Sequence, residues 1–397
     1  MSGPMNDALA LDAPHGFADS KFEHIGLLAL YGVAGALQFS IAIAQIFLAV
    51  AILCWVGTLV VGRERADAPK FFLPLLVYAG ITIVSAIFSY DPRTSIVDCK
   101  QLVLFLLVPV TYRFVSGSRG LTLIMVVVTC AAISAALGIV QYGILHFDQL
   151  GQRVQGTLGH YMTYSGLLML VIAIALARVL FGRGDRTWPA LVIPALAVAV
   201  ALTFTRNAMV GVLAAAAVLF SLKDFRLFAI APLAVAIFIA AAPGKIYQRF
   251  VSIFDLKDPT NRDRVAMLHI GERMIASHPL TGVGPNMVER LYADFRGPDA
   301  VKAINPHLHN VPLQIAAERG LPALAVWLWF IVVAIGDSWK RFQHDDAYRF
   351  LAAAALACIT ALLTAGMFEY NFGDSEVLML FLIVVTLPAA AARPSAA

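Results

Sequence analysis

The sequence predicts an all-α protein that crosses a membrane with about 12 helices. Of the 397 residues, 60% are hydrophobic and only 14% are charged, compared with roughly 25% charged residues in an average soluble domain. A soluble protein cannot bury so much apolar surface, so lipid must solvate part of it. The apolar runs have helical length, and none shows the alternating pattern of a membrane β-barrel. This composition excludes a soluble enzyme, a disordered chain and a nucleic-acid-binding module.

The apolar runs define the predicted spans, because a bilayer core of about 30 Å requires about 20 helical residues. Residues 25–61 contain no charge and are long enough for two spans, and Gln38 and Ser40 mark the turn between them. The further predicted spans are 71–88, 101–116, 120–144, 161–181, 188–205, 207–222, 225–243, 313–336, 348–368 and 376–392.

The positive charges of the short loops predict the orientation of the bundle. One side carries 15 Lys and Arg residues, whereas the short connections on the other side carry four. Cytoplasmic loops are the ones enriched in these residues, so we expect both termini in the cytoplasm. The first 24 residues lack the apolar core and the cleavage site of a removed signal peptide.

One polar segment of 69 residues, 244–312, separates the spans on the external side. It divides the chain into residues 1–243 with nine predicted spans, the large external loop, and residues 313–397 with three. Within the loop, residues 264–277 have the apolar pattern of an amphipathic helix, which His278-Pro279 ends. A loop this long in a compact protein is usually functional, so we expect the chemistry where the loop meets the membrane.

Two arginines are notable on the external side. Arg206 and Asn207 form the whole connection between two predicted spans, which puts the Arg206 charge at the outer edge of the apolar slab. A charge there is costly and indicates a functional site, although an arginine can also snorkel to the interface. Arg264 lies at the start of the loop helix, where Arg262 is equally plausible from the residues alone. For either one, a solvated charge at a helix start is the simpler explanation.

Two histidines close the external loop. Residues 305–312 read Asn-Pro-His-Leu-His-Asn-Val-Pro, in which Asn310 can cap a helix and Pro312 suits its first turn. His309 is thereby held near a helix start at the membrane surface, and histidine can accept a proton near neutral pH. His307 and His309 could instead bind a metal, but the loop offers no third and fourth ligand at motif spacing. We therefore expect no metal site.

Carboxylates are scarce where other mechanisms need them. The external face has no Asp-x-Asp pair of the kind that holds a metal on a sugar phosphate. The spans are almost free of the carboxylates that ion-coupled transporters use, with Glu318 and Glu369 only near the outer ends. Arginines bind a diphosphate through paired hydrogen bonds, and a histidine base can deprotonate a hydroxyl. The residues therefore favour glycosyl transfer from a lipid-linked diphosphate sugar, outside the cytoplasm.

Three stretches resemble the bacterial O-antigen ligase and O-antigen polymerase superfamily. Residues 203–208 (Thr-Phe-Thr-Arg-Asn-Ala) are similar to the family's Ser-Arg at the start of a span. Within 264–285, an Arg precedes the Pro of His-Pro-Leu-Thr-Gly-Val-Gly-Pro by 15 residues, as in the family pattern, and this spacing selects Arg264 over Arg262. Residues 307–321 are similar to the family's His-Asn-x-x-Leu-Gln followed by Glu-x-Gly.

A weaker match is Arg-Val-Gln-Gly-Thr-Leu-Gly-His at 153–160. Two features depart from the family pattern. Met267 and Leu268 lie where the family often has Trp, and Asn207 takes the place of a common Gly. Neither departure removes a proposed chemical group.

The resemblance implies a GT-C-type glycosyltransferase fold and the activity of an O-antigen ligase. Such a ligase joins the O-antigen glycan of undecaprenyl diphosphate to lipid A–core at the periplasmic face of the bacterial inner membrane. The reaction is inverting and needs neither metal nor other cofactor. The matching positions imply His309 as general base, with Arg264 and Arg206 holding the donor diphosphate. The further substrate-binding candidates are Arg153, His160, Arg290, His307 and Asn310. The expected partners are these two glycolipids and membrane lipids, with no nucleic acid.

Three other functions stay open. An O-antigen polymerase uses a second lipid-linked repeat as its acceptor, but it typically carries two large external loops. A protein O-glycosylating transferase usually adds a soluble C-terminal region. A flippase or permease that only moves a lipid-linked glycan would also use outward-facing arginines, but it would not need His309. Substitution of His309 therefore separates transfer from transport.

Overall fold

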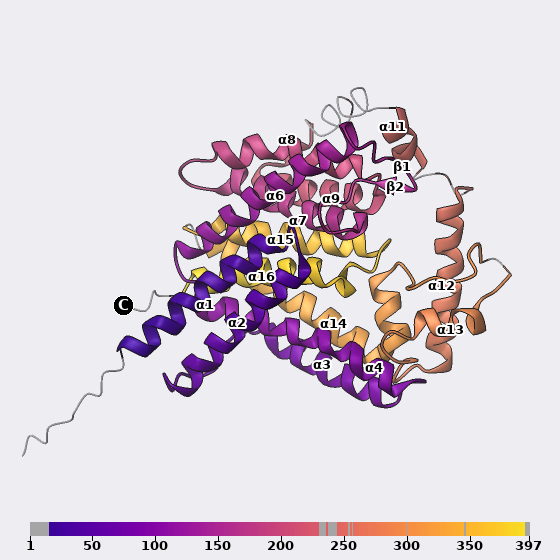
Figure 1. Ribbon diagram of the computed structural model, residues 1–397, viewed down its shortest axis with the longest axis horizontal. Helices are drawn as coiled ribbons and strands as arrows, with labels where there is room; N and C mark the ends of the chain where they lie inside the picture. Colours follow the sequence, from indigo (N-terminus) through magenta and orange to yellow (C-terminus); the bar gives the residue numbers. More distant parts are fainter. Residues whose placement is uncertain are drawn as a thin grey trace, which may run out of the picture.

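The computed structural model describes residues 16–393, except for 230–235, 237–243, 253–254, 256, 299 and 345–346. The described chain is helical apart from one short antiparallel hairpin (Figure 1). Its first half contains α1 (Gly16–Ala36), α2 (Ile41–Val60), α3 (Phe72–Ile87), α4 (Pro92–Asp98), the 3-10 helix η1 (Cys99–Leu106), α5 (Leu107–Phe114), α6 (Arg119–Gly143), β1 (Asp148–Gln149), β2 (Gln152–Arg153), α7 (Tyr161–Phe181), α8 (Thr187–Leu202) and α9 (Arg206–Lys223). Its second half contains η2 (Phe225–Ala229), α11 (Gly244–Val251), α12 (Pro259–Ser277), α13 (Val288–Phe295), α14 (Val311–His344), α15 (Arg349–Gly366), η4 (Asn371–Gly373) and α16 (Ser375–Ala391).

Among the residues that the structure describes, seven helices are long and apolar enough to cross a membrane. They are α2, the continuous segment Pro92–Phe114, α6, α7, α9, α14 and α15, and the shorter apolar helices are α3, α8 and α16. The predicted all-α protein with multiple membrane spans is thus confirmed, whereas the number of 12 spans stays a prediction. The predicted span 225–243 lies mostly outside the described residues.

The helices α7 and α15 form the centre of the bundle. In the apolar window of each, 78% of the residues are buried, compared with 28% in α2. Small side chains make this close packing possible. For example, Gly211 of α9 lies against Met169 of α7 and Ala361 of α15. The start of α9 and the end of α15 therefore lie close together, and both carry residues of the site described below.

The two ends of the described chain lie at the same end of the bundle. Arg119, at the start of α6, bonds Glu23 of α1 at 2.6 Å, and Arg393, after α16, donates to the carbonyl oxygen of Tyr112 at 2.6 Å. The helices α12 and α13 lie at the opposite end (Figure 1). The predicted turn at Gln38 is confirmed, because α1 ends at Ala36 and α2 begins at Ile41.

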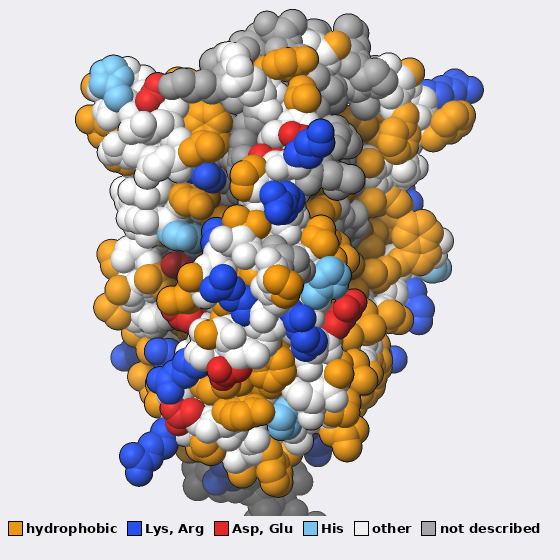
Figure 2. Space-filling model, turned by 90° about the vertical axis from the view of Figure 1, so that its right-hand side faces the viewer, with side chains coloured by type: hydrophobic (Ala, Val, Ile, Leu, Met, Phe, Trp, Pro, Cys, Tyr) orange, Lys and Arg blue, Asp and Glu red, His pale blue; other side chains and the backbone are white. Residues whose placement is uncertain are grey.

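The predicted helix of the long loop exists and begins earlier than expected. Helix α12 starts at Pro259, because the Asp258 carboxylate accepts hydrogen bonds from the backbone N–H groups of Thr260 and Asn261 and proline suits the first helical position. The helix ends at Ser277, as His278-Pro279 predicts. Figure 2 shows the end of the molecule at which α12 and α13 lie. Lys and Arg side chains gather across the middle of this surface, whereas hydrophobic side chains dominate its flanks.

The two glycine-containing motifs that resemble the family form a joint between the loop and α14. Gly320 has φ 81° and interrupts α14, which frees backbone groups on both sides of the break. The loop after α12 satisfies them: Gly284 N–H donates to the carbonyl oxygen of Glu318 at 2.9 Å, and Leu321 N–H donates to that of Pro279 at 2.8 Å. These motifs therefore fix the position of α12 on the bundle.

Candidate active site

A basic cavity of about 150 Å³ lies where α12 meets the first turn of α9. The side chains of charged residues and histidine that line it are Arg153, Arg206, Arg264, Lys302, Asp263 and His309. Four cations face one carboxylate, so an anion is the ligand that the cavity suits. Four residues predicted from the sequence, three arginines and His309, thus come together from segments far apart in the chain.

Arg206 is the first residue of α9, and its side chain is 5% exposed. Its Nη1 donates to the carbonyl oxygen of Ser252 at 2.8 Å, and its Nη2 lies 3.4 Å from Oδ1 of Asp258. Phe204 adopts φ 55° just before the helix, a left-handed conformation that is uncommon outside glycine. Arg206 thereby links α9 to the segment that precedes α12.

Arg264 of α12 contributes a guanidinium with unused hydrogen-bonding capacity. Its Cζ lies 5.8 Å from the ring centre of Phe368, and its buried Nε has no partner among the described residues. Burial lowers the pKa of Arg264, and the nearby charge of Arg206 lowers it as well, although an arginine keeps its proton in a protein. A buried donor without a partner is uncommon in folded proteins and fits an anionic oxygen of a ligand.

Arg153 completes the cationic wall. It lies in β2, its guanidinium stacks 4.3 Å from the ring centre of Tyr161, and its Nε donates to the carbonyl oxygen of Leu150 at 3.0 Å. These contacts hold the side chain without neutralising its charge.

A carboxylate connects the two predicted histidines. Glu369 lies in the connection between α15 and η4. Its Oε2 lies 2.9 Å from Nδ1 of His309, and its Oε1 lies 3.3 Å from Nε2 of His307. The two imidazole rings meet edge to face with their centres 4.1 Å apart. We call these three residues the His–Glu–His cluster.

The charge of Glu369 determines which ring nitrogen of His309 donates a hydrogen bond. Burial alone would raise the pKa of this carboxyl, but the hydrogen bond and the charge of His309, together with His307, lower it to about 2. An ionised carboxylate only accepts hydrogen bonds, so His309 donates through Nδ1 and keeps its lone pair at Nε2. Nε2 of His307 faces the other oxygen of this carboxylate, and its buried Nδ1 has no hydrogen-bond partner among the described residues. Burial lowers the pKa of His307 to about 4, so its ring is neutral at pH 7.

The local sequence explains how His309 is held. The predicted cap at Asn310 is confirmed, because its Oδ1 accepts a hydrogen bond from Leu313 N–H at 2.9 Å. Gln314 Oε1 accepts one from Leu308 N–H at 2.7 Å and fixes the preceding loop. His309 itself has φ 49°, a left-handed conformation that surrounding structure must enforce. Such backbone strain is typical of functional positions.

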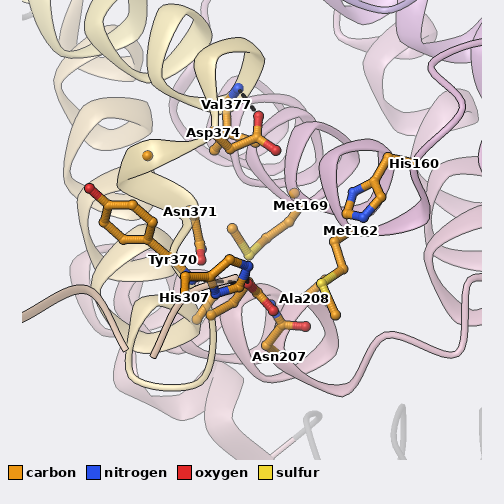
Figure 3. Close-up of a pocket in the computed structure, with 14 residues that line it drawn as sticks. His160, Met162, Met169, Asn207, Ala208, His307, Tyr370, Asn371, Asp374 and Val377 are labelled. Carbon is orange, nitrogen blue, oxygen red and sulfur yellow. Dashed lines mark hydrogen bonds and ion pairs between the residues drawn. The ribbon is translucent and has the colours of Figure 1, made fainter. Parts of the chain in front are cut away.

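A second cavity of about 160 Å³ adjoins the basic cavity, and Met162 and Asn207 line both. We call it the Asn371 cavity; its polar lining consists of His160, His307, Glu369, Tyr370, Asn371 and Asp374, together with Asn207. Figure 3 shows His160 and Met162 on the side opposite Asn371 and His307. His307 and Glu369 line this cavity and His309 lines the other, so the His–Glu–His cluster lies between the two.

Residues 190–328 match the family model described as O-antigen ligase. This segment belongs to the O-antigen ligase and polymerase superfamily. A search of curated proteins found no match. The O-antigen ligase segment runs from α8 into α14 and contains Arg206, Arg264 and both histidines of the cluster, so the family assignment and the cavity geometry concern the same residues.

Two predicted residues of the O-antigen ligase segment lie outside both cavities. Arg290 of α13 forms an ion pair with Asp91 at the start of α4, and its side chain is 56% exposed. Asn310 uses its amide within the protein, because its Nδ2 also donates to the carbonyl oxygen of Met367 at 3.2 Å. A substrate contact by either residue stays a prediction.

Glu369 belongs to the site, although the sequence predicts no role for it. In the sequence, Glu369 stands out only as a carboxylate at the outer end of a predicted span, in a chain whose spans contain few carboxylates. It lies outside the O-antigen ligase segment, 60 residues after His309. It also provides a third potential metal ligand beside the two histidines, because one ligand atom each from His307, His309 and Glu369 lie within 4.8 Å of one another. The response of activity to a chelator is therefore an informative measurement.

Proposed function

We propose that the protein transfers an O-antigen glycan from undecaprenyl diphosphate to a sugar hydroxyl of lipid A–core, by an inverting reaction without metal. The observation that carries the proposal is the position of His309, which lines the same cavity as three arginines. A membrane protein of the O-antigen ligase superfamily with such a cavity fits a lipid-linked glycan as donor. The charge distribution of the loops supports a site on the periplasmic face of the inner membrane, with both termini in the cytoplasm.

In this proposal His309 acts as the general base. Its Nε2 takes the proton of the acceptor hydroxyl while the hydroxyl oxygen attacks the anomeric carbon of the donor sugar. The bond from that carbon to the diphosphate oxygen breaks, and its electron pair leaves with the diphosphate. Glu369 stabilises the imidazolium through the bond to Nδ1, as a carboxylate does in other histidine bases. His309 then releases its proton to solvent.

The arginines stabilise the leaving group. A departing diphosphate gains negative charge, which fixed cations in a water-poor cavity stabilise strongly. Arg264 offers its unpartnered Nε, and Arg153 is a second cation without a carboxylate bonded to it among the described residues. Arg206 shares its charge with Asp258, so we assign it a positioning role beside the phosphates.

The test is glycan transfer by purified protein in detergent, with EDTA present. The substrates are undecaprenyl-diphosphate-linked O-antigen and lipid A–core. Product on lipid A–core in the presence of EDTA supports a metal-independent ligase. Longer lipid-linked chains as the sole product indicate a polymerase. If EDTA abolishes the activity and a divalent metal restores it, the His–Glu–His cluster is a metal site. If the protein forms no product but moves the lipid-linked glycan across a membrane, it is a flippase.

A further inference from the structure

We infer that the Asn371 cavity binds the acceptor sugar, separately from the donor diphosphate in the basic cavity. The inference rests on the proposed transfer reaction and adds to it a binding place for the second substrate. Three observations carry it: the charge of the two cavities, the buried polar atoms that have no partner in each, and the position of the His–Glu–His cluster.

The first observation is that charge is segregated between the cavities. The basic cavity holds three arginines and a lysine, whereas the part of the Asn371 cavity that the structure describes is lined by the carboxylates Glu369 and Asp374 and by no Lys or Arg. A diphosphate is repelled by such a lining. A neutral sugar is not, because its hydroxyl groups donate hydrogen bonds to carboxylates and amides.

The second observation is that the unpartnered atoms of the two cavities are of opposite kinds. The basic cavity contains an unused donor, Nε of Arg264. In the Asn371 cavity the unpartnered atoms are Oδ1 of Asn371, an acceptor whose residue is 5% exposed, and Nδ1 of His307, whose Nε2 lies 3.3 Å from Oε1 of Glu369. Figure 3 shows the Asn371 side chain directed toward His307. Buried acceptors require donors, and a hydroxyl-rich ligand supplies them.

The remaining lining also suits a sugar. Met162, Met169 and the ring of Tyr370 provide apolar surface beside the polar groups, and a sugar ring has apolar C–H faces as well as hydroxyls. His160 is held by Thr163, whose hydroxyl in turn donates to Asp374 at 2.5 Å. The polar groups are therefore held in place by other side chains, as in a preformed binding site.

The third observation is the arrangement of the two cavities around the base. The His–Glu–His cluster lies between them, with His309 on the diphosphate side and His307 and Glu369 on the other. An inverting displacement needs the attacking hydroxyl and the leaving diphosphate on opposite faces of the anomeric carbon. The two cavities adjoin at Met162 and Asn207, so a sugar hydroxyl that extends from the Asn371 cavity across this boundary can approach both Nε2 of His309 and the anomeric carbon of the donor.

The experiment compares the KM for each substrate in two isosteric variants of Asn371. Asn371→Leu removes the acceptor atom, and Asn371→Asp keeps an oxygen in the same place. We expect Asn371→Leu to raise the KM for lipid A–core about tenfold, the value of one hydrogen bond, with the KM for the donor unchanged. Asn371→Asp should stay close to the wild-type values. Met209→Leu, a volume-conserving change at a buried residue of α9 that lines neither cavity, is the matched control and should leave both KM values unchanged.

The outcomes separate this inference from the proposed function. If the wild-type protein transfers no glycan, the proposed function fails. If it does, and Asn371→Leu raises the donor KM or changes neither KM, the acceptor assignment is overturned and the proposed function stands. If Asn371→Leu does not fold, Asn371→Ala carries the same expectation, because it removes the amide without adding bulk.

Discussion

Replacing Arg264 by methionine is predicted to make the ligand-free protein more stable and much less active. The native side chain places a guanidinium among buried groups, beside the charge of Arg206 and with a buried Nε that no described residue accepts from. Methionine has a similar length, no charge and good helix propensity. It therefore removes the cost of the unsatisfied donor and keeps most of the packing.

The magnitudes follow from that geometry. A buried donor without a partner costs about 1–3 kcal/mol, and removing a neighbouring like charge adds to the gain, so the free energy of unfolding is expected to rise by about 1–3 kcal/mol. Loss of one cation on the leaving group is expected to lower kcat by about 100- to 1000-fold, which corresponds to roughly 3–4 kcal/mol of transition-state stabilisation.

The assays are thermal unfolding in detergent without ligand and steady-state glycan transfer. Arg262→Met is the matched control, because Arg262 lies on the same helix two residues earlier with an exposed side chain; it should change neither quantity by much. A lower unfolding temperature for Arg264→Met would mean that the guanidinium has a structural partner. Wild-type activity in this variant would refute its role on the diphosphate.

Three further predictions concern the cluster and the joint. Glu369→Gln should lower kcat by at least about 100-fold with little change in donor KM, because an amide cannot stabilise the imidazolium of His309; a large change in donor KM alone would contradict this. Because burial holds the pKa of His307 near 4 against 6.5 in the unfolded chain, the unfolded state binds the extra proton and stability should fall as pH drops from 6.5 to 4. Unfolding temperature against pH tests this, and His307→Asn should lose that part of the decline. Gly320→Ala should destabilise the protein by roughly 2–4 kcal/mol, since its φ is 81° and the added Cβ would overlap the carbonyl oxygen of Leu280; an unchanged unfolding temperature would refute the strain argument.

The sequence predicts the helical elements well because each depends on local chemistry. Apolar runs of helical length identify the spans, and His278-Pro279 ends α12 where expected. The apolar pattern predicts a start at Arg264, whereas α12 begins at Pro259, because the cap precedes the first apolar residues of the pattern. Asp258-Pro259 is a start signal in its own right.

The site could be predicted only in part, for a physical reason. Arg206, Arg264 and His309 carry recognisable local contexts, whereas Glu369 and Asn371 follow a span whose own sequence gives no sign of what it packs against. Their role depends on the contact of α15 with α9 and α14, which no local pattern encodes. The glycine motifs show the converse. They are prominent in the sequence, and the structure uses them to join the loop to α14.

The measurement that tests the central claim most directly compares donor binding and glycan transfer in wild type and His309→Ala. Purified proteins are titrated with undecaprenyl-diphosphate-linked O-antigen, and transfer to lipid A–core is then measured on the same samples. We predict that the variant binds the donor with near wild-type affinity, because the arginines are intact, and forms no product. Product formation at the wild-type rate by His309→Ala would contradict the account, because the protein would then transfer or move the glycan without this base.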